Sequence, residues 1–137
     1  MLFDLQQLTS SHEELNIHLK QYGIHIDFKT RLILLSETKK LLAVYFKESL
    51  ALNKILLQQR NTAKHFESTM NRYVGETHAE GKRIIDLIQK YDANTDEKKR
   101  FKFQMDIAEA LSLLEHRIGI EKKYFIPEYI LTLKNSK

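Results

Sequence analysis

The stretch that decides the fold is IAEALSLLEHRIGIEKKYF, residues 107–125. Its apolar side chains recur at steps of three and four residues, which places them on one face of a helix. The inward row reads Ile107, Leu111, Leu114, Ile118, Glu121 and Phe125. A carboxylate on such a face is costly unless it is paired or bound to a metal ion. Glu121 is therefore the first candidate for a functional residue.

The same period, followed outward, predicts three more helices. We expect helices over residues 2–22 and 30–59, a third from the Asn61–Thr62 pair to about residue 91, and a fourth from about residue 96 to beyond residue 124. Pro127 should kink or end the last helix near Ile126, because proline lacks the amide hydrogen. Long helices joined by short loops predict an all-α fold, an antiparallel up-down-up-down four-helix bundle that forms one domain over residues 1–137.

Composition narrows the class of protein. The 137 residues are 42% hydrophobic and 29% charged, which is ordinary for one folded domain. There is no cysteine, which excludes disulfides, thiolate zinc sites and cysteine nucleophiles. There is no Gly-x-Ser-x-Gly turn or glycine-rich phosphate loop, so we expect a protein that is not an enzyme.

The N-terminus lacks signal-peptide features and no window approaches about 18 apolar residues, so we expect a cytoplasmic protein without a membrane partner.

The chain is mildly basic, with a net charge of +4. One tight basic group occurs, at Lys98, Lys99, Arg100 and Lys102. Such a group can bind phosphate, but acidic residues precede and follow it here. The pattern therefore favours a solvated helix start over a nucleic-acid contact.

Polar residues on the predicted inward faces are the candidates for a site. They are His12 on the first helix, Tyr45, Glu48 and Ser49 on the second, His78 on the third, and Glu121 on the fourth with His116 and Arg117 close by. Four-helix bundles build di-metal sites from His and carboxylate side chains of facing helices, and these ligands suit iron, manganese or zinc. The candidate ligands are His12, Glu48, His78, His116 and Glu121. His18, His25 and His65 lie off the stripes and are predicted at the surface or in loops.

The run LEHRIGIEKKYFIP, residues 114–127, resembles the last helix of the hemerythrin-like (HHE) cation-binding domains. In that family a His is followed one turn later by an acid, then by an aromatic residue and a proline. His12 and His78 are similar to the lone His of its first and third helices. The resemblance implies a non-haem di-iron centre, or a site for another divalent cation. The chain departs from the family on the second helix, where Tyr45 and Ser49 stand in place of His and Glu, and at Arg117, where an ungapped alignment expects His.

The same run also resembles the last helix of bacterial anti-sigma regulators of the regulator-of-sigma-D type. That helix carries an Arg with an acid one turn later, as Arg117 and Glu121 do. This resemblance implies a metal-free protein-interaction module, a transcription regulator with a sigma factor or RNA polymerase as its partner. Two hypotheses therefore stay open, with a bound cation in one and no cofactor in the other. In the first Glu121 is a ligand beside His12 and His78, and in the second it pairs with Arg117.

Overall fold

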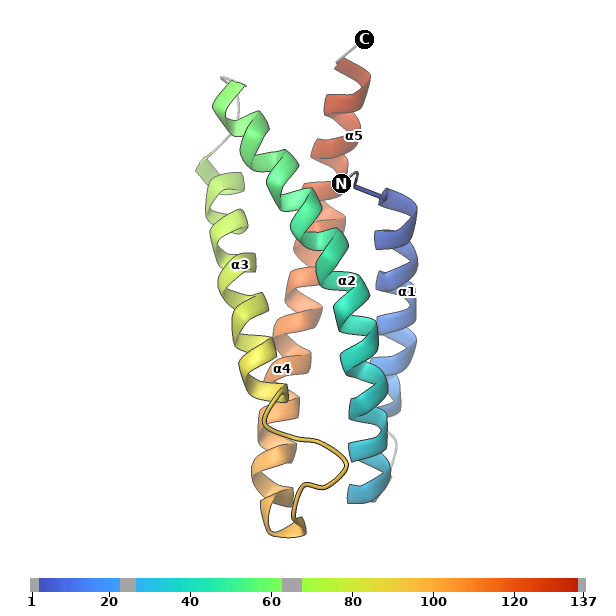
Figure 1. Cartoon of the computed structure of the whole chain (residues 1–137). Coiled ribbons are helices and arrows are strands. Elements are labelled where there is room, and N and C mark those ends of the chain that lie inside the picture. The colour runs from blue at the N-terminus through green and yellow to red at the C-terminus, as the bar shows by residue number, and fades with distance from the viewer. Residues whose placement is uncertain (1–2, 23–26, 63–67, 136–137) are drawn as a thin grey trace.

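The computed structural model describes residues 3–22, 27–62 and 68–135. Its elements are α1 (Leu5–Tyr22), α2 (Phe28–Thr62), α3 (Ser68–Ile88), the short 3₁₀ helix η1 (Glu97–Lys99), α4 (Arg100–Ile120), the π-helical turn η2 (Glu121–Phe125) and α5 (Ile126–Asn135). Within these ranges the secondary structure is helical and no strand occurs, so the all-α prediction is confirmed. Figure 1 shows α1 to α4 side by side with alternating chain direction, which is compatible with the predicted up-down-up-down bundle.

Local sequence explains where several of the helices begin. Asp4 accepts a hydrogen bond from the amide of Gln7 at 3.0 Å, and Asp27 accepts one from the amide of Thr30 at 2.7 Å. Asp96 accepts from the amide of Lys98 at 2.9 Å and caps η1. Each carboxylate satisfies an amide that the first turn leaves without a partner. The predicted start near residue 96 is confirmed, and α2 ends at Thr62, where a break was expected.

Pro127 does not end the helical path near Ile126. The amide of Ile126 bonds the carbonyl of Glu121, five residues earlier, instead of the usual partner four residues earlier. This π-helical turn shifts the hydrogen-bond register just before the proline, whose missing amide is tolerated in the first turn of the following helix. Of the two predicted outcomes, a kink or an end near Ile126, the end is wrong, because α5 continues from the π-helical turn.

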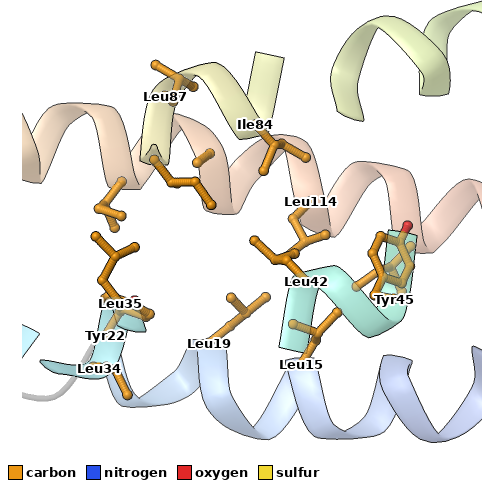
Figure 2. Packing of buried hydrophobic residues seen from close by; sticks show 14 of the residues in the cluster. Leu15, Leu19, Tyr22, Leu34, Leu35, Leu42, Tyr45, Ile84, Leu87 and Leu114 are labelled. Carbon is orange, nitrogen blue, oxygen red and sulfur yellow. The ribbon is translucent and has the colours of Figure 1, made fainter. Parts of the chain in front are cut away.

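The core lies between the helices and is mostly aliphatic. α1 packs mainly on α2, and α3 packs mainly on α4, so the chain forms two helical hairpins. Figure 2 shows Leu15 and Leu19 of α1 pointing toward Leu42 of α2 and Leu114 of α4. All four side chains are buried, and burying each large aliphatic side chain contributes about 1.5–3 kcal/mol. This apolar packing surrounds the polar side chains described next.

Candidate functional site

Glu121 is fully buried in the core, with 0% of its surface exposed. It is the first residue of η2. Tyr45 Oη and Ser49 Oγ of α2 each donate to its carboxylate at 2.5 Å. His12 Nε2 of α1 donates to the same carboxylate at 3.0 Å. Both carboxylate oxygens are thus hydrogen-bonded, and the buried charge is solvated by protein groups in place of water.

Arg117, one helical turn before Glu121, is also buried. Its Nε donates to Tyr45 Oη at 3.0 Å and its Nη2 donates to Ser49 Oγ at 2.7 Å. Its Nη1 donates to the carbonyl of Thr77 on α3. We call His12, Tyr45, Ser49, Arg117 and Glu121 the central polar network. It links α1, α2 and α4, and through Thr77 it reaches α3.

Within the central polar network, the hydroxyls of Tyr45 and Ser49 stand between the two charges. Each hydroxyl accepts from Arg117 and donates to Glu121. Burial raises the pKa of Tyr45 well above its usual value of 10, and the charge of Glu121 raises it further. Tyr45 therefore keeps its proton and remains a donor at neutral pH. Removing each of these two ions from water costs several kcal/mol, and the opposite charge and the hydrogen bonds of the network offset part of that cost.

Gly81 of α3 makes room for the Arg117 guanidinium. A Cβ atom at Gly81 would overlap Arg117 Nη1 and would lie 3.3 Å from Phe46 Cε1. The guanidinium carbon lies 5.0 Å from the centre of the Phe46 ring and 5.7 Å from that of Tyr45. These are cation–π distances. The glycine thus lets α3 approach the charged end of Arg117, which is held between aromatic rings and hydrogen-bond acceptors.

Two of the five predicted metal ligands come together, and they are His12 and Glu121. His12 is 1% exposed, as its place on the inward stripe predicted. Its Nδ1 atom is buried and has no hydrogen-bond partner among the described residues. Glu48 is buried too, but its carboxylate accepts from the amide of Asp4 at 2.8 Å. It therefore holds the segment that leads into α1.

The prediction that His78 points inward is wrong, because its side chain is exposed. The buried side of α3 carries the row Val74, Thr77, Gly81, Ile84 and Ile88, with Leu87 beside it. A row through Val74, His78, Gly81, Ile85 and Ile88, which would put His78 inward, has the same spacing. Both rows step by three and four residues and share three members, so the periodicity alone fits either. The two rows differ by a small rotation of the helix, and that rotation turns His78 toward solvent.

His116 also lies at the surface. Its side chain is 55% exposed, and its Nδ1 atom donates to Glu80 Oε2 at 2.6 Å. Within the part of the chain that the structure describes, no group of three or more His, Asp or Glu side chains has the spacing to hold a metal ion. The five predicted ligands are thus distributed over separate places, apart from the His12–Glu121 contact.

A second buried polar cluster was missed from the sequence. His18, predicted at the surface, is 5% exposed. Its Nε2 lies 2.5 Å from Thr38 Oγ1, and Tyr22 Oη lies 2.6 Å from the same atom. Thr38 donates its own proton to the carbonyl of Leu34 at 2.9 Å, so both rings donate to Thr38. Burial raises the pKa of Tyr22 to about 12. The sequence did contain a signal for the burial of His18, because Leu15, His18 and Tyr22 are spaced three and four residues apart and so share one helix face.

A groove runs between α2 and α3 on the outside of the bundle. One part has a volume of about 340 Å³ and is lined by Lys39, Leu42, Ala43, Phe46, Ile85, Ile88 and Gln89. The next part has a volume of about 220 Å³ and is lined by Phe46, Leu50, His78, Gly81, Lys82, Ile85 and Arg117. Phe46 and Ile85 line both parts. The two parts therefore form one continuous feature, the α2–α3 groove. Its second part reaches the guanidinium of Arg117, so the groove adjoins the central polar network.

None of the helices in the described ranges is long and apolar enough to cross a lipid bilayer. Comparisons of the chain with protein-family models, with curated proteins and with solved structures gave no match.

Proposed function

We propose that the chain is a protein-interaction module, a metal-free antiparallel bundle without enzymatic activity that receives a segment of a partner protein in the α2–α3 groove. The observation that carries this proposal is the apolar lining of the groove. Leu50 and Ile85 are 47% and 43% exposed there, beside Phe46, which is partly buried. Apolar side chains that gather in one open hollow are typical of a binding surface.

The central polar network supports the metal-free part of the proposal. Both oxygens of Glu121 already accept hydrogen bonds, and two of them come from hydroxyls at 2.5 Å. Arg117 brings a positive charge to the same hydroxyls. A nearby guanidinium disfavours the binding of a second cation at this place. In this proposal the network is structural, and it holds α2 and α3 in the positions that shape the groove.

A charge placed in the groove tests the proposal. Ile85→Glu puts a carboxylate into the apolar lining, and Ile33→Glu is the matched control because Ile33 is 61% exposed on α2 and does not line the groove. We expect a partner captured by the wild-type chain in source cells to be recovered about tenfold less with Ile85→Glu and unchanged with Ile33→Glu. Circular dichroism of both variants checks that each remains folded.

The resemblance to anti-sigma regulators predicts which protein the partner is. It predicts that a sigma factor or RNA polymerase is among the proteins whose recovery depends on Ile85. Direct titration of the purified pair then measures the affinity. Equal recovery of every captured protein with Ile85→Glu and Ile33→Glu would contradict the groove as the binding surface. Groove-dependent capture of other proteins alone would contradict the sigma-factor version and leave the interaction module standing.

Cation binding, the function implied by the hemerythrin-like resemblance, is a second candidate. The observation that favours it is the contact of 3.0 Å between the buried His12 and Glu121. Elemental analysis of protein purified without chelator tests it. A stoichiometry near one ion per chain, with a higher melting temperature on adding Fe(II), Mn(II) or Zn(II), would support it. Less than about 0.1 ion per chain without a change in melting temperature would rule it out.

A further inference from the structure

A groove of this kind selects its occupant by shape, length and charge. Resting on the proposed function, we infer that the α2–α3 groove takes an amphipathic helix of about three turns from the partner. This helix carries an acidic side chain at the end that faces Lys82 and Arg117. The inference rests on the walls of the groove, on its length and on its charge.

The walls favour a helix over an extended strand. Both walls are helices, whose backbone amides and carbonyls are already bonded within each helix. They present side chains and offer no row of free backbone groups to pair with a strand. A helical partner satisfies its own backbone and lays an apolar face against Phe46, Leu50 and Ile85, as in other helix-in-groove complexes.

The length of the groove sets the length of the partner helix. On α2 the lining runs from Lys39 to Leu50, and on the other wall it runs from His78 of α3 to Gln89, which directly follows that helix. At ~1.5 Å of rise per residue, each wall is about 16 Å long. An occupant helix of three turns matches this length and presents apolar side chains at positions i, i+3, i+4 and i+7.

The charge of the groove favours an acidic occupant. Among the residues that the structure describes, the charged side chains that line it are Lys39, Lys82 and Arg117, all of them basic. Lys39 donates to the carbonyl of Tyr91, whereas Lys82 is exposed at the rim. Arg117 is buried, with 1% of its surface exposed, so it contributes its positive charge beneath this end of the groove while Lys82 offers the accessible donors. A carboxylate at this end completes the charge pairing.

A display library of 14-residue segments, selected on the purified full chain, tests the inference. Half of the positions are randomised between acidic, basic and apolar residues. We expect the selected segments to carry apolar residues at helical spacing with Asp or Glu at one end. The best segment should bind about tenfold more weakly to the Lys82→Glu variant, and a version with Lys in place of its acid should regain that affinity.

The matched control for Lys82→Glu is Lys20→Glu. Lys20 is an exposed lysine of α1 that lines a different hollow beside Glu115. The control substitution makes the same change in net charge, and we expect it to weaken binding less than about twofold. Both lysines are exposed, so the variants should fold as the wild type does.

Each alternative outcome separates this inference from the proposed function. Segments that bind the groove without preference for acids, or proline-rich extended segments, would overturn the inference and leave the groove as a binding surface. The inference would fail in the same way if the library yielded no groove binder while Ile85→Glu still abolished partner capture. Segments that bind Ile85→Glu as well as wild type would show a site elsewhere and would overturn both. A dimer in solution that Ile85→Glu dissociates would identify a second copy as the occupant and overturn the acidic-helix inference.

Discussion

The opposite charges of Arg117 and Glu121 meet through two hydroxyl groups, those of Tyr45 and Ser49, in the core of the bundle. Among the described residues no direct ion pair joins the two side chains, although they are one helical turn apart. Each hydroxyl has one proton to donate and lone pairs to accept, so it serves both charges at once. The stability of the core should therefore depend on α2 as much as on the charged residues themselves.

Removing the Tyr45 hydroxyl should destabilise the protein. Tyr45→Phe keeps the ring but leaves Glu121 without one donor and Arg117 without one acceptor in a buried site. We expect a loss of about 2–3 kcal/mol in the free energy of unfolding, measured by urea denaturation. Tyr129→Phe is the control, because Tyr129 is only partly buried and lies outside the network. A loss below about 0.5 kcal/mol for Tyr45→Phe would contradict a structural role for the hydroxyl.

Two glycines of α3 should respond in opposite directions to alanine. At Gly75 an added Cβ meets no atom within 4 Å, so Gly75→Ala should stabilise the helix by up to about 1 kcal/mol. At Gly81 the added Cβ overlaps Arg117 Nη1. Gly81→Ala should therefore cost about 1–3 kcal/mol, because it displaces a guanidinium held by three hydrogen bonds. Thermal unfolding of the pair measures the difference, and equal stabilisation by both would contradict the close contact.

Alkaline pH should weaken the fold through Tyr22. Burial raises the pKa of Tyr22 from 10.0 to about 12, so the folded state holds this proton more tightly than the unfolded chain does. The resulting stabilisation is fully present below pH ~10 and is lost as the pH rises toward 12. We expect a decrease of about 2 kcal/mol from this residue between those limits, measured by urea unfolding across the range. The Tyr22→Phe variant should show a shallower decrease, and an unchanged slope would disprove the assignment.

Thr38 should contribute more to the stability of the fold than its small size indicates. Thr38→Val keeps the shape of the side chain but removes the acceptor that His18 and Tyr22 share. We expect a loss of about 1–3 kcal/mol in the free energy of unfolding, because two buried donors lose their partner. Thr9→Val is the matched control, since the exposed Thr9 hydroxyl bonds only the carbonyl of Leu5 in its own helix. Similar losses in the two variants, followed by urea denaturation, would contradict this interpretation.

The sequence predicted the helices well because their cause is local. Apolar spacing and helix-breaking residues are properties of neighbouring residues, and they placed the start near residue 96 correctly and a break at the pair where α2 ends, although the predicted end at residue 59 was three residues early. The sequence could not decide between a kink and an end at Pro127, because the outcome depends on a shift of hydrogen-bond register to Glu121. A π-helical turn of this kind has no residue pattern of its own.

The candidate site was predicted in part. Glu121 and His12 were recognised because a charge or an imidazole interrupts an apolar stripe, and both are buried. His78 was misplaced because two rows of α3 fit the same period. The bridging role of Tyr45 and Ser49 depends on the distance between α2 and α4, which no single helix encodes. Tertiary packing, rather than periodicity, decides which polar groups meet.

The π-helical turn at residues 121–125 also sets the rotation of the C-terminal helix. Deleting one residue from this turn would convert it to ordinary α-helix and rotate everything after it by about 100°. Ile126 and Tyr129 would leave their places against the core, while Ile130 and Leu133, now at the surface, would turn to new directions. The single extra residue thus sets the rotation of α5 about its own axis relative to α4. It fixes which side of α5 faces the bundle, directly after the turn that begins at the buried Glu121.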